Sequence, residues 1–181
     1  MNHRLLCTLG LIVFGILVFA AMPAMAVNAP GFYYVMPSWD QTLPGVTRFI
    51  VLTNMSSAAV LDRETGLVWE QSPSPDTFSW DAAQSHCNLL TTGNRIGWHL
   101  PTVQELSSLV NPSVASPGPT LPSGHPFSNV QSYFYWSATT TAFSTDTAWG
   151  VYFDVGHASL FGKSTATYVW CVRGGHGVDA Q

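Results

Sequence analysis

The chain has 181 residues, of which 46% are hydrophobic and only 9% are charged, and its formal net charge is −4 at pH 7. This length suits one domain, and the acidic balance excludes a basic surface for nucleic acid. The same balance argues against a purely electrostatic hold on sulfated polysaccharides. A low charge content combined with 13% aromatic residues is typical of a β-rich domain that works outside the cytoplasm.

Residues 1–26 have the features of a signal peptide. Arg4 precedes an apolar run at 5–21, and Ala24-Met25-Ala26 gives the small-x-small pattern that signal peptidase needs. Cleavage after Ala26 would leave no stable membrane span, and the protein would be exported to the periplasm, the cell surface or the medium. The alternative is an uncleaved anchor, because the apolar run nearly reaches the length of a bilayer span.

Export would leave two cysteines in the mature chain, Cys87 and Cys171. A single pair in an exported protein predicts a disulfide, and two unpaired buried thiols are the alternative. On the chain-entropy model, a bridge across so long a loop contributes about 4–5 kcal/mol to stability.

The first half of the domain is predicted to contain three short strands and two helices. Residues 27–46 hold several prolines and aromatic residues and are expected to form an N-terminal arm. The predicted strands are 47–53, 58–62 and 67–70, separated by polar turns. Ser79 then stands at a helix N-cap, and Trp80, Ala83, Cys87 and Leu90 follow at helical spacing, so Cys87 should face the core.

A second short helix is expected at about 103–110, because Thr102 and Glu105 have the spacing of a capping box. Residues 111–132 then form a long, proline-rich connection, which is either a structured surface loop or a mobile one. The rest of the chain alternates strands and turns. Strands are predicted at 133–139, 148–153, 158–161 and 167–173, Trp136 and Trp170 are expected in the core, and the tail at 176–181 is expected to be flexible.

Six blocks in this order resemble those of the Lcl C-terminal domain family, a bacterial domain of unknown function. The blocks are VLDRETGLVWE, SWDAAQSHCNLL, WHLPTVQEL, YWSAT, AWGVYF and WCVRGG, and they cover roughly 60–175. The chain departs from the family pattern at His99, where the family usually has arginine, and in the turn after the first predicted strand.

The resemblance implies an α+β fold similar to C-type lectin-like and formylglycine-generating domains. Such a fold has two short helices, a twisted antiparallel sheet and one long-range disulfide, for which Cys87 and Cys171 are the counterparts. The expected organisation is a signal peptide at 1–26, an arm at 27–46, the lectin-like domain at 47–175 and a tail at 176–181.

The sequence contains no pattern that predicts a catalytic or metal site. The Glu-Pro-Asn, Gln-Pro-Asp and Trp-Asn-Asp motifs of calcium-dependent lectins are absent, and a structural disulfide would leave no thiol for oxidase chemistry. The mature histidines lack zinc-ligand spacing: His86, His99, His125, His157 and His176. We therefore expect no cofactor and no metal. A nucleophilic triad is not excluded, because triads are assembled in space.

The candidate ligand-binding surface lies on the last strands. In AWGVYF, alternation places Tyr152 and Asp154 on the face opposite Trp149. The predicted site residues are Tyr152, Asp154, His157 and Ser159, with Asp146 from the neighbouring loop. The alternative is an ordinary solvated sheet face. The leading hypothesis is an exported, non-enzymatic recognition or adhesion module for a protein or glycan; the alternatives are a structural envelope-associated domain without a small ligand, or an unrecognised enzyme.

Overall fold

The structure is a computed structural model that describes residues 43–174. The predicted signal peptide, most of the predicted N-terminal arm and the predicted tail lie outside the described residues. The described part has the expected α+β fold with short helices, antiparallel sheets and a Cys87–Cys171 disulfide. Its helices are α1 (Gly45–Arg48), α2 (Trp80–Leu89) and α3 (Val103–Ser107), with 3-10 turns at Thr53–Met55 and Thr92–Asn94.

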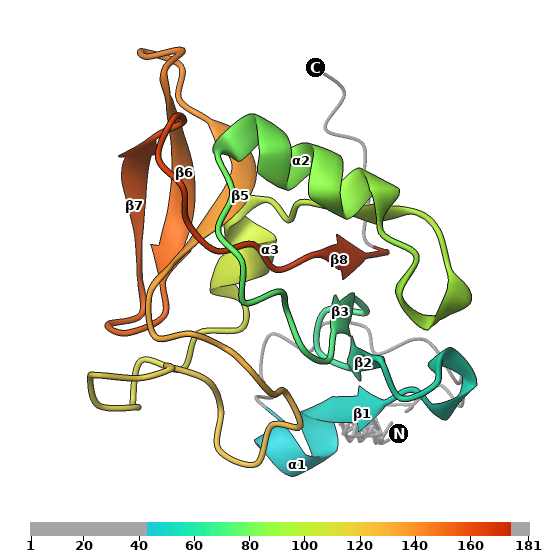
Figure 1. The fold of residues 1–181 in the computed structure, drawn as a ribbon. Coiled ribbons are helices and arrows are strands. Elements are labelled where there is room, and N and C mark those ends of the chain that lie inside the picture. Colours follow the sequence, from blue (N-terminus) through green and yellow to red (C-terminus); the bar gives the residue numbers. More distant parts are fainter. Residues whose placement is uncertain (1–42, 175–181) are drawn as a thin grey trace, which may run out of the picture. The chain divides into compact units, whose positions relative to one another are not determined.

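The strands form two antiparallel sheets (Figure 1). The five-stranded sheet has the order β1-β2-β3-β8-β4, and the three-stranded sheet has the order β5-β6-β7. The strands of the first sheet are β1 (Phe49–Val51), β2 (Ala59–Asp62), β3 (Val68–Glu70), β4 (Trp98–His99) and β8 (Val172–Arg173). Those of the second are β5 (Phe134–Thr140), β6 (Thr147–Tyr152) and β7 (His157–Gly162).

The segment before β8 connects the two sheets. The predicted strand 167–173 is shorter than expected, because only Val172–Arg173 pairs as a strand with β3 and β4. Its first part instead lies parallel to β5, where Trp136 N donates to Tyr168 O at 3.0 Å. The predicted strand 47–53 also differs, because its first residues belong to the one-turn helix α1 and only 49–51 pair with β2.

The core consists of two adjoining clusters rich in aromatic side chains. Trp69, Trp136 and Trp170 are fully buried, as expected for the last two. The first cluster includes Trp69, Leu106, Phe127, Tyr135, Val151, Phe153 and Trp170. The second includes Ala83, Cys87, Trp98, Phe134, Trp136, Ala148 and Cys171. The disulfide therefore lies inside the core and ties α2 to the segment before β8, which confirms the predicted pairing.

The predicted apolar stripe of α2 and the predicted capping box of α3 are confirmed, whereas Ser79 occupies the N-cap position of α2 without a side-chain capping hydrogen bond. Ala83 and Cys87 are the buried residues of α2, on the predicted apolar stripe. At α3, Thr102 accepts from Glu105 N while the Glu105 carboxylate accepts from Thr102 N at 2.8 Å, which is the predicted capping box. The helix itself is shorter than the predicted 103–110, because the chain turns after Ser107.

The proline-rich connection at 111–132 is a packed surface loop. Thr120 N donates to Phe153 O at 2.7 Å, and Asn111 N donates to Thr120 O at 2.7 Å. Leu121 and Phe127 are buried in the first core cluster. These contacts attach the loop to the end of β6, next to the predicted binding residues. Within 43–174, the structure contains no helix that is both long and apolar enough to span a bilayer.

Candidate functional site

Three of the predicted site residues share one face of the three-stranded sheet. Tyr152 on β6 is paired with His157 on β7, and Gly150 is paired with Ser159 two positions further along. Paired residues in an antiparallel ladder project to the same side, and so do alternate residues of one strand. Tyr152, His157 and Ser159 therefore lie on the same side of the sheet.

The two predicted carboxylates lie at opposite ends of β6, so the structure does not bring Asp146 next to Asp154. Asp154 follows β6 in the turn to β7, whereas Asp146 precedes β6 at the other end of the sheet. The six residues of β6 separate them by roughly 20 Å at about 3.4 Å per residue. Asp146 instead accepts a hydrogen bond on its backbone oxygen from Lys163 N at 2.9 Å.

Aromatic side chains gather around Tyr152 and form what we call the tyrosine cluster: Tyr133, Tyr152, His157, Phe161 and Tyr168. The ring of Tyr133 lies 6.2 Å from that of Tyr152 and 6.1 Å from that of Tyr168, in both cases nearly perpendicular. The rings of Tyr152 and His157 are 5.4 Å apart. Tyr133 is 49% exposed and His157 is also exposed, so the cluster presents ring surface to solvent.

A buried aromatic layer lies beside the cluster on the same side of the sheet, because Phe134 on β5 is paired with Tyr152 on β6. Phe134 is fully buried, stacks on Phe161 with ring centres 4.8 Å apart, and meets Tyr152 at 4.9 Å. Gly150 makes room for this layer, because a Cβ there would collide with the Phe134 ring and the Tyr135 carbonyl. Close packing of this kind holds the exposed rings in fixed positions.

The hydroxyl of Tyr152 is an uncharged polar group within the cluster. Partial burial, together with Tyr133 and the nearby Asp154, raises the pKa of Tyr152, so its hydroxyl stays protonated at neutral pH. A protonated phenol can both donate and accept a hydrogen bond. The cluster therefore combines apolar ring surface with hydroxyl groups, as amphipathic aromatic side chains do at many interfaces.

Sequence reasoning missed Tyr133, Phe161 and Tyr168 as members of the site. Tyr133 directly precedes β5, and Tyr168 lies in the segment that runs beside β5. No pattern in the sequence singled out Tyr168; the structure shows that its neighbours Thr167 and Val169 are buried while Tyr168 is half-exposed. That alternation indicates a side chain directed away from the second core cluster.

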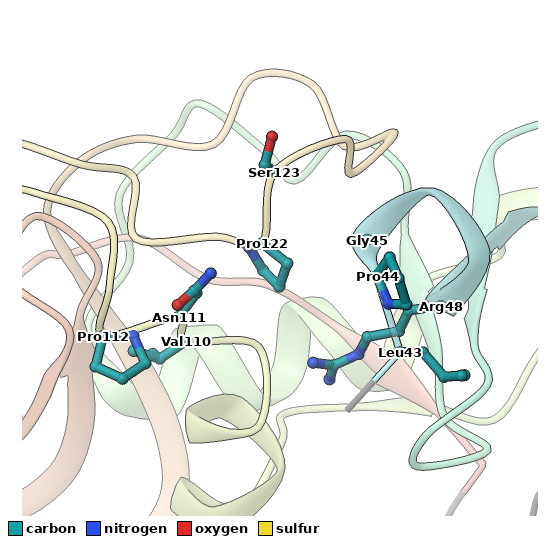
Figure 2. A pocket seen from close by; sticks show the side chains of 9 residues that line it. All are labelled: Leu43, Pro44, Gly45, Arg48, Val110, Asn111, Pro112, Pro122 and Ser123. Atoms are coloured by element: carbon teal, nitrogen blue, oxygen red, sulfur yellow. The ribbon is translucent and has the colours of Figure 1, made fainter. Parts of the chain in front are cut away.

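A separate pocket of about 570 Å³ lies between α1 and the proline-rich connection. It is lined by Leu43, Pro44, Gly45, Arg48, Val110, Asn111, Pro112, Pro122 and Ser123 (Figure 2). Arg48 is the one ionisable side chain among these lining residues. In Figure 2 its side chain extends from α1 toward the side of Val110 and Asn111.

Arg48 is already engaged by other groups and is poorly suited to bind an anion. Its guanidinium donates to both carboxylate oxygens of Asp62 at 2.8 and 2.7 Å and to Ser108 O at 2.8 Å. It also pairs with Glu64 at 2.9 Å. These contacts join α1 to β2 and to the end of α3. Because two carboxylates face one guanidinium, the network carries a net negative charge and would repel an anionic ligand.

The family model for the Lcl C-terminal domain matches residues 58–173, which is more than half of the chain. The chain belongs to the Lcl C-terminal domain family. The resemblance read from the six sequence blocks is therefore confirmed, and the matched region contains the disulfide and the whole tyrosine cluster. No curated protein matches the chain.

Within the described residues of this Lcl C-terminal domain, no serine or threonine hydroxyl is hydrogen-bonded to a histidine, and both cysteines are in the disulfide. His86 packs on Phe78 and His125 packs on Phe127. Burial lowers the pKa of both histidines, with Asp76 opposing the effect at His86. No group of three or more metal-ligating side chains occurs in the same part of the chain.

One carboxyl group of the domain is buried without a cationic partner. Glu70 on β3 is 5% exposed, and its Oε2 accepts from Cys171 N at 3.1 Å. Its backbone oxygen accepts from Trp170 Nε1 at 2.9 Å. Burial raises the pKa of Glu70 to about 7, although the hydrogen bonds from Cys171 and Thr92 act in the opposite direction. Glu70 therefore lies at the junction between β3 and the disulfide.

Proposed function

We propose that this protein is an exported, non-enzymatic recognition module that binds a glycan or a protein through the tyrosine cluster. The observation that carries the proposal is the group of Tyr133, Tyr152 and Tyr168, whose rings meet edge to face beside the exposed His157. Aromatic side chains of this kind provide a large contact area at a small cost in conformational entropy.

The chemistry of the cluster favours an uncharged ligand surface. Flat rings fit the apolar faces of sugar rings or of proline and aliphatic side chains, and the neighbouring hydroxyls can bond polar groups at their edges. Lys163, the single lysine of the sequence, follows β7 and lies over the Trp80 ring at 4.2 Å rather than beside Tyr152. A sulfated or phosphorylated ligand would find Asp154 close to the cluster instead of a cation.

Export is supported by the buried disulfide, because such bonds persist in oxidising compartments. The small-x-small pattern at Ala24-Met25-Ala26 supports cleavage of a signal peptide. Intact mass of the protein recovered from cells, measured with and without reduction and alkylation, tests both points. A mass that retains residues 1–26 would contradict cleavage, and alkylation of two thiols without reduction would contradict the disulfide.

Binding is tested with a glycan array and a pull-down from envelope extract, each followed by titration of variants. Tyr133→Ala and Tyr152→Ala are expected to weaken binding roughly tenfold or more, which is the usual effect of removing an aromatic anchor. Phe143→Ala is the matched control, because Phe143 is a 79% exposed aromatic residue outside the cluster. Tyr152→Phe separates the contribution of the hydroxyl from that of the ring.

The result decides between the recognition module and its alternatives. Equal binding by the wild type, Tyr152→Ala and Phe143→Ala would show that the ligand binds elsewhere on the protein. Absence of any glycan or protein ligand in both assays would favour a structural envelope-associated domain. Turnover of a substrate that is lost on a single serine or histidine substitution would favour an enzyme.

A further inference from the structure

Strand β7 forms the outer edge of the three-stranded sheet (Figure 1). It is six residues long and contains neither proline nor a fixed charge: His157, Ala158, Ser159, Leu160, Phe161 and Gly162. All of its residues are exposed or half-buried. An edge strand of this length usually carries a lysine, a proline or a bulge that prevents another strand from pairing with it. The described residues of β7 have none of these devices, and its pairing with β6 is continuous.

The hydrogen-bond pattern defines which backbone groups face outward from this edge. Lys163 N donates to Asp146 O. This bond shows which of the opposing residues of β6 and β7 form hydrogen-bonded pairs. On the other side of β6, Phe153 N donates to Tyr133 O. Since antiparallel strands alternate between bonding inward and outward, both observations give the same assignment. The residues bonded to β6 are His157, Ser159 and Phe161, and those that face outward are Ala158, Leu160 and Gly162.

The outward-facing groups define a short free edge with a clear centre. Gly162 O is occupied, because it accepts from Thr165 N at 2.9 Å. The other outward groups of Ala158, Leu160 and Gly162 bond to nothing else within 43–174. The free edge therefore runs from Ala158 to the Gly162 N–H, and its middle residue is Leu160.

We propose that a second copy of this chain pairs with β7 across a two-fold axis at Leu160. An antiparallel partner centred there places Leu160 opposite its own counterpart and Ala158 opposite Gly162. The small side chains flank the leucine pair, and no like charges meet within 158–162. A two-fold contact is self-complementary and therefore closes as a dimer instead of growing into a fibre.

Dimerisation through β7 would double the surface used for recognition. In a continuous antiparallel sheet, paired residues project to the same side, so the Ser159 and Phe161 faces of both copies would lie together. Each copy's Tyr152 is on this side of the sheet. Two tyrosine clusters side by side would bind a repetitive ligand with avidity. This consequence rests on the proposed function, whereas the dimer itself does not.

The oligomeric state of the protein, expressed with residues 1–181 and purified as the cell processes it, tests the proposal. Light scattering after size-exclusion chromatography should approach twice the monomer mass as concentration rises to on the order of 1 mM, the weak end of specific association. Leu160→Pro removes the central outward N–H without removing a bond to β6, and should yield the monomer. Leu160→Ala is the matched control, because it shortens the side chain but keeps the N–H and should retain a dimer. Near-ultraviolet circular dichroism verifies that both variants are folded.

A cysteine variant keeps the test decisive if Leu160→Pro fails to fold. Leu160→Cys would place two thiols on the axis at about 5.5 Å between Cα atoms, within reach of a disulfide. Oxidation should then give covalent dimers, whereas Ser164→Cys, which is exposed in the turn after β7, should give few. A wild-type protein that is monomeric throughout, or equal cross-linking by both cysteine variants, would overturn the proposal. Ligand binding by a monomer would leave the proposed function intact.

Discussion

The buried Glu70 predicts that the stability of this domain falls as pH rises from about 4.5 to about 7. Burial raises its pKa from the ordinary value of 4.5 to about 7. A carboxyl group with a raised pKa binds more protons in the folded state than in the unfolded state. Its contribution to stability is therefore complete below about pH 4.5 and is lost as pH rises to about 7.

The size of the effect follows from the same two values. The change in pKa corresponds to about 3 kcal/mol, at about 1.4 kcal/mol per pKa unit. Part of that is already lost at pH 5, so about 2–3 kcal/mol should disappear between pH 5 and pH 8. The group is only 5% exposed, so solvent provides little screening that would reduce this value.

Glu70→Gln isolates this contribution. The glutamine oxygen can still accept from Cys171 N, but the side chain no longer ionises. We expect the free energy of unfolding of the variant, relative to wild type, to increase by about 2–3 kcal/mol from pH 5 to pH 8. Urea unfolding at both pH values, followed by tryptophan fluorescence with the disulfide intact, measures the difference. Any constant cost of fitting the amide cancels in this comparison.

Two other observations make the test specific. The pKa values of His86 and His125 are lowered, so these groups favour the folded state at higher pH, but they do so equally in both proteins. Asp146→Asn removes an exposed carboxylate and serves as the control. A difference between Glu70→Gln and wild type that is the same at both pH values, within about 0.5 kcal/mol, would refute the reasoning. It would mean that Glu70 is ionised in the folded protein at pH 5.

Three further predictions concern interactions that stabilise the fold. Gly150→Ala should lower the unfolding free energy by about 1–3 kcal/mol, because the added methyl collides with Phe134; an unchanged melting temperature would contradict this. Asp62→Ala should cost about 3–5 kcal/mol in urea unfolding, because it leaves the buried Arg48 without its bidentate partner, and an effect below about 1 kcal/mol would be unexpected. Replacing both half-cystines by serine should lower stability by about 2–5 kcal/mol, as measured against the oxidised protein, and equal stability would exclude a structural role for the bridge.

The features that the sequence predicted correctly depend on local spacing. The capping box at Thr102 and Glu105 needs only four consecutive residues, and the structure contains both of its hydrogen bonds. The inward position of Cys87 follows from the helical period of its neighbours. The alternation of side chains along β6 is likewise local, and the structure has Trp149 and Val151 paired with Leu160 and Ala158, and Tyr152 paired with His157.

The features that could not be predicted depend on register between distant segments. Tyr133, Tyr152 and Tyr168 come from three parts of the chain, and nothing local indicates that their rings meet. The buried pair of Arg48 and Asp62 could not be predicted either, because a charged residue in a short polar segment is usually exposed. The separation of Asp146 from Asp154, in contrast, could have been inferred, because a six-residue strand between them already implies a large distance.

The segment before β8 explains why one covalent bond matters for a surface on the other sheet. Tyr168 bonds to β5 and belongs to the tyrosine cluster, whereas Cys171, three residues later, is fixed to α2 by the disulfide and to Glu70 by a hydrogen bond. Val172 then enters the five-stranded sheet between β3 and β4. So short a segment, anchored at each of these points, leaves Tyr168 little freedom to move relative to Tyr133. The position of the exposed rings is therefore determined by contacts within the core, and the loops around them can vary without disturbing it.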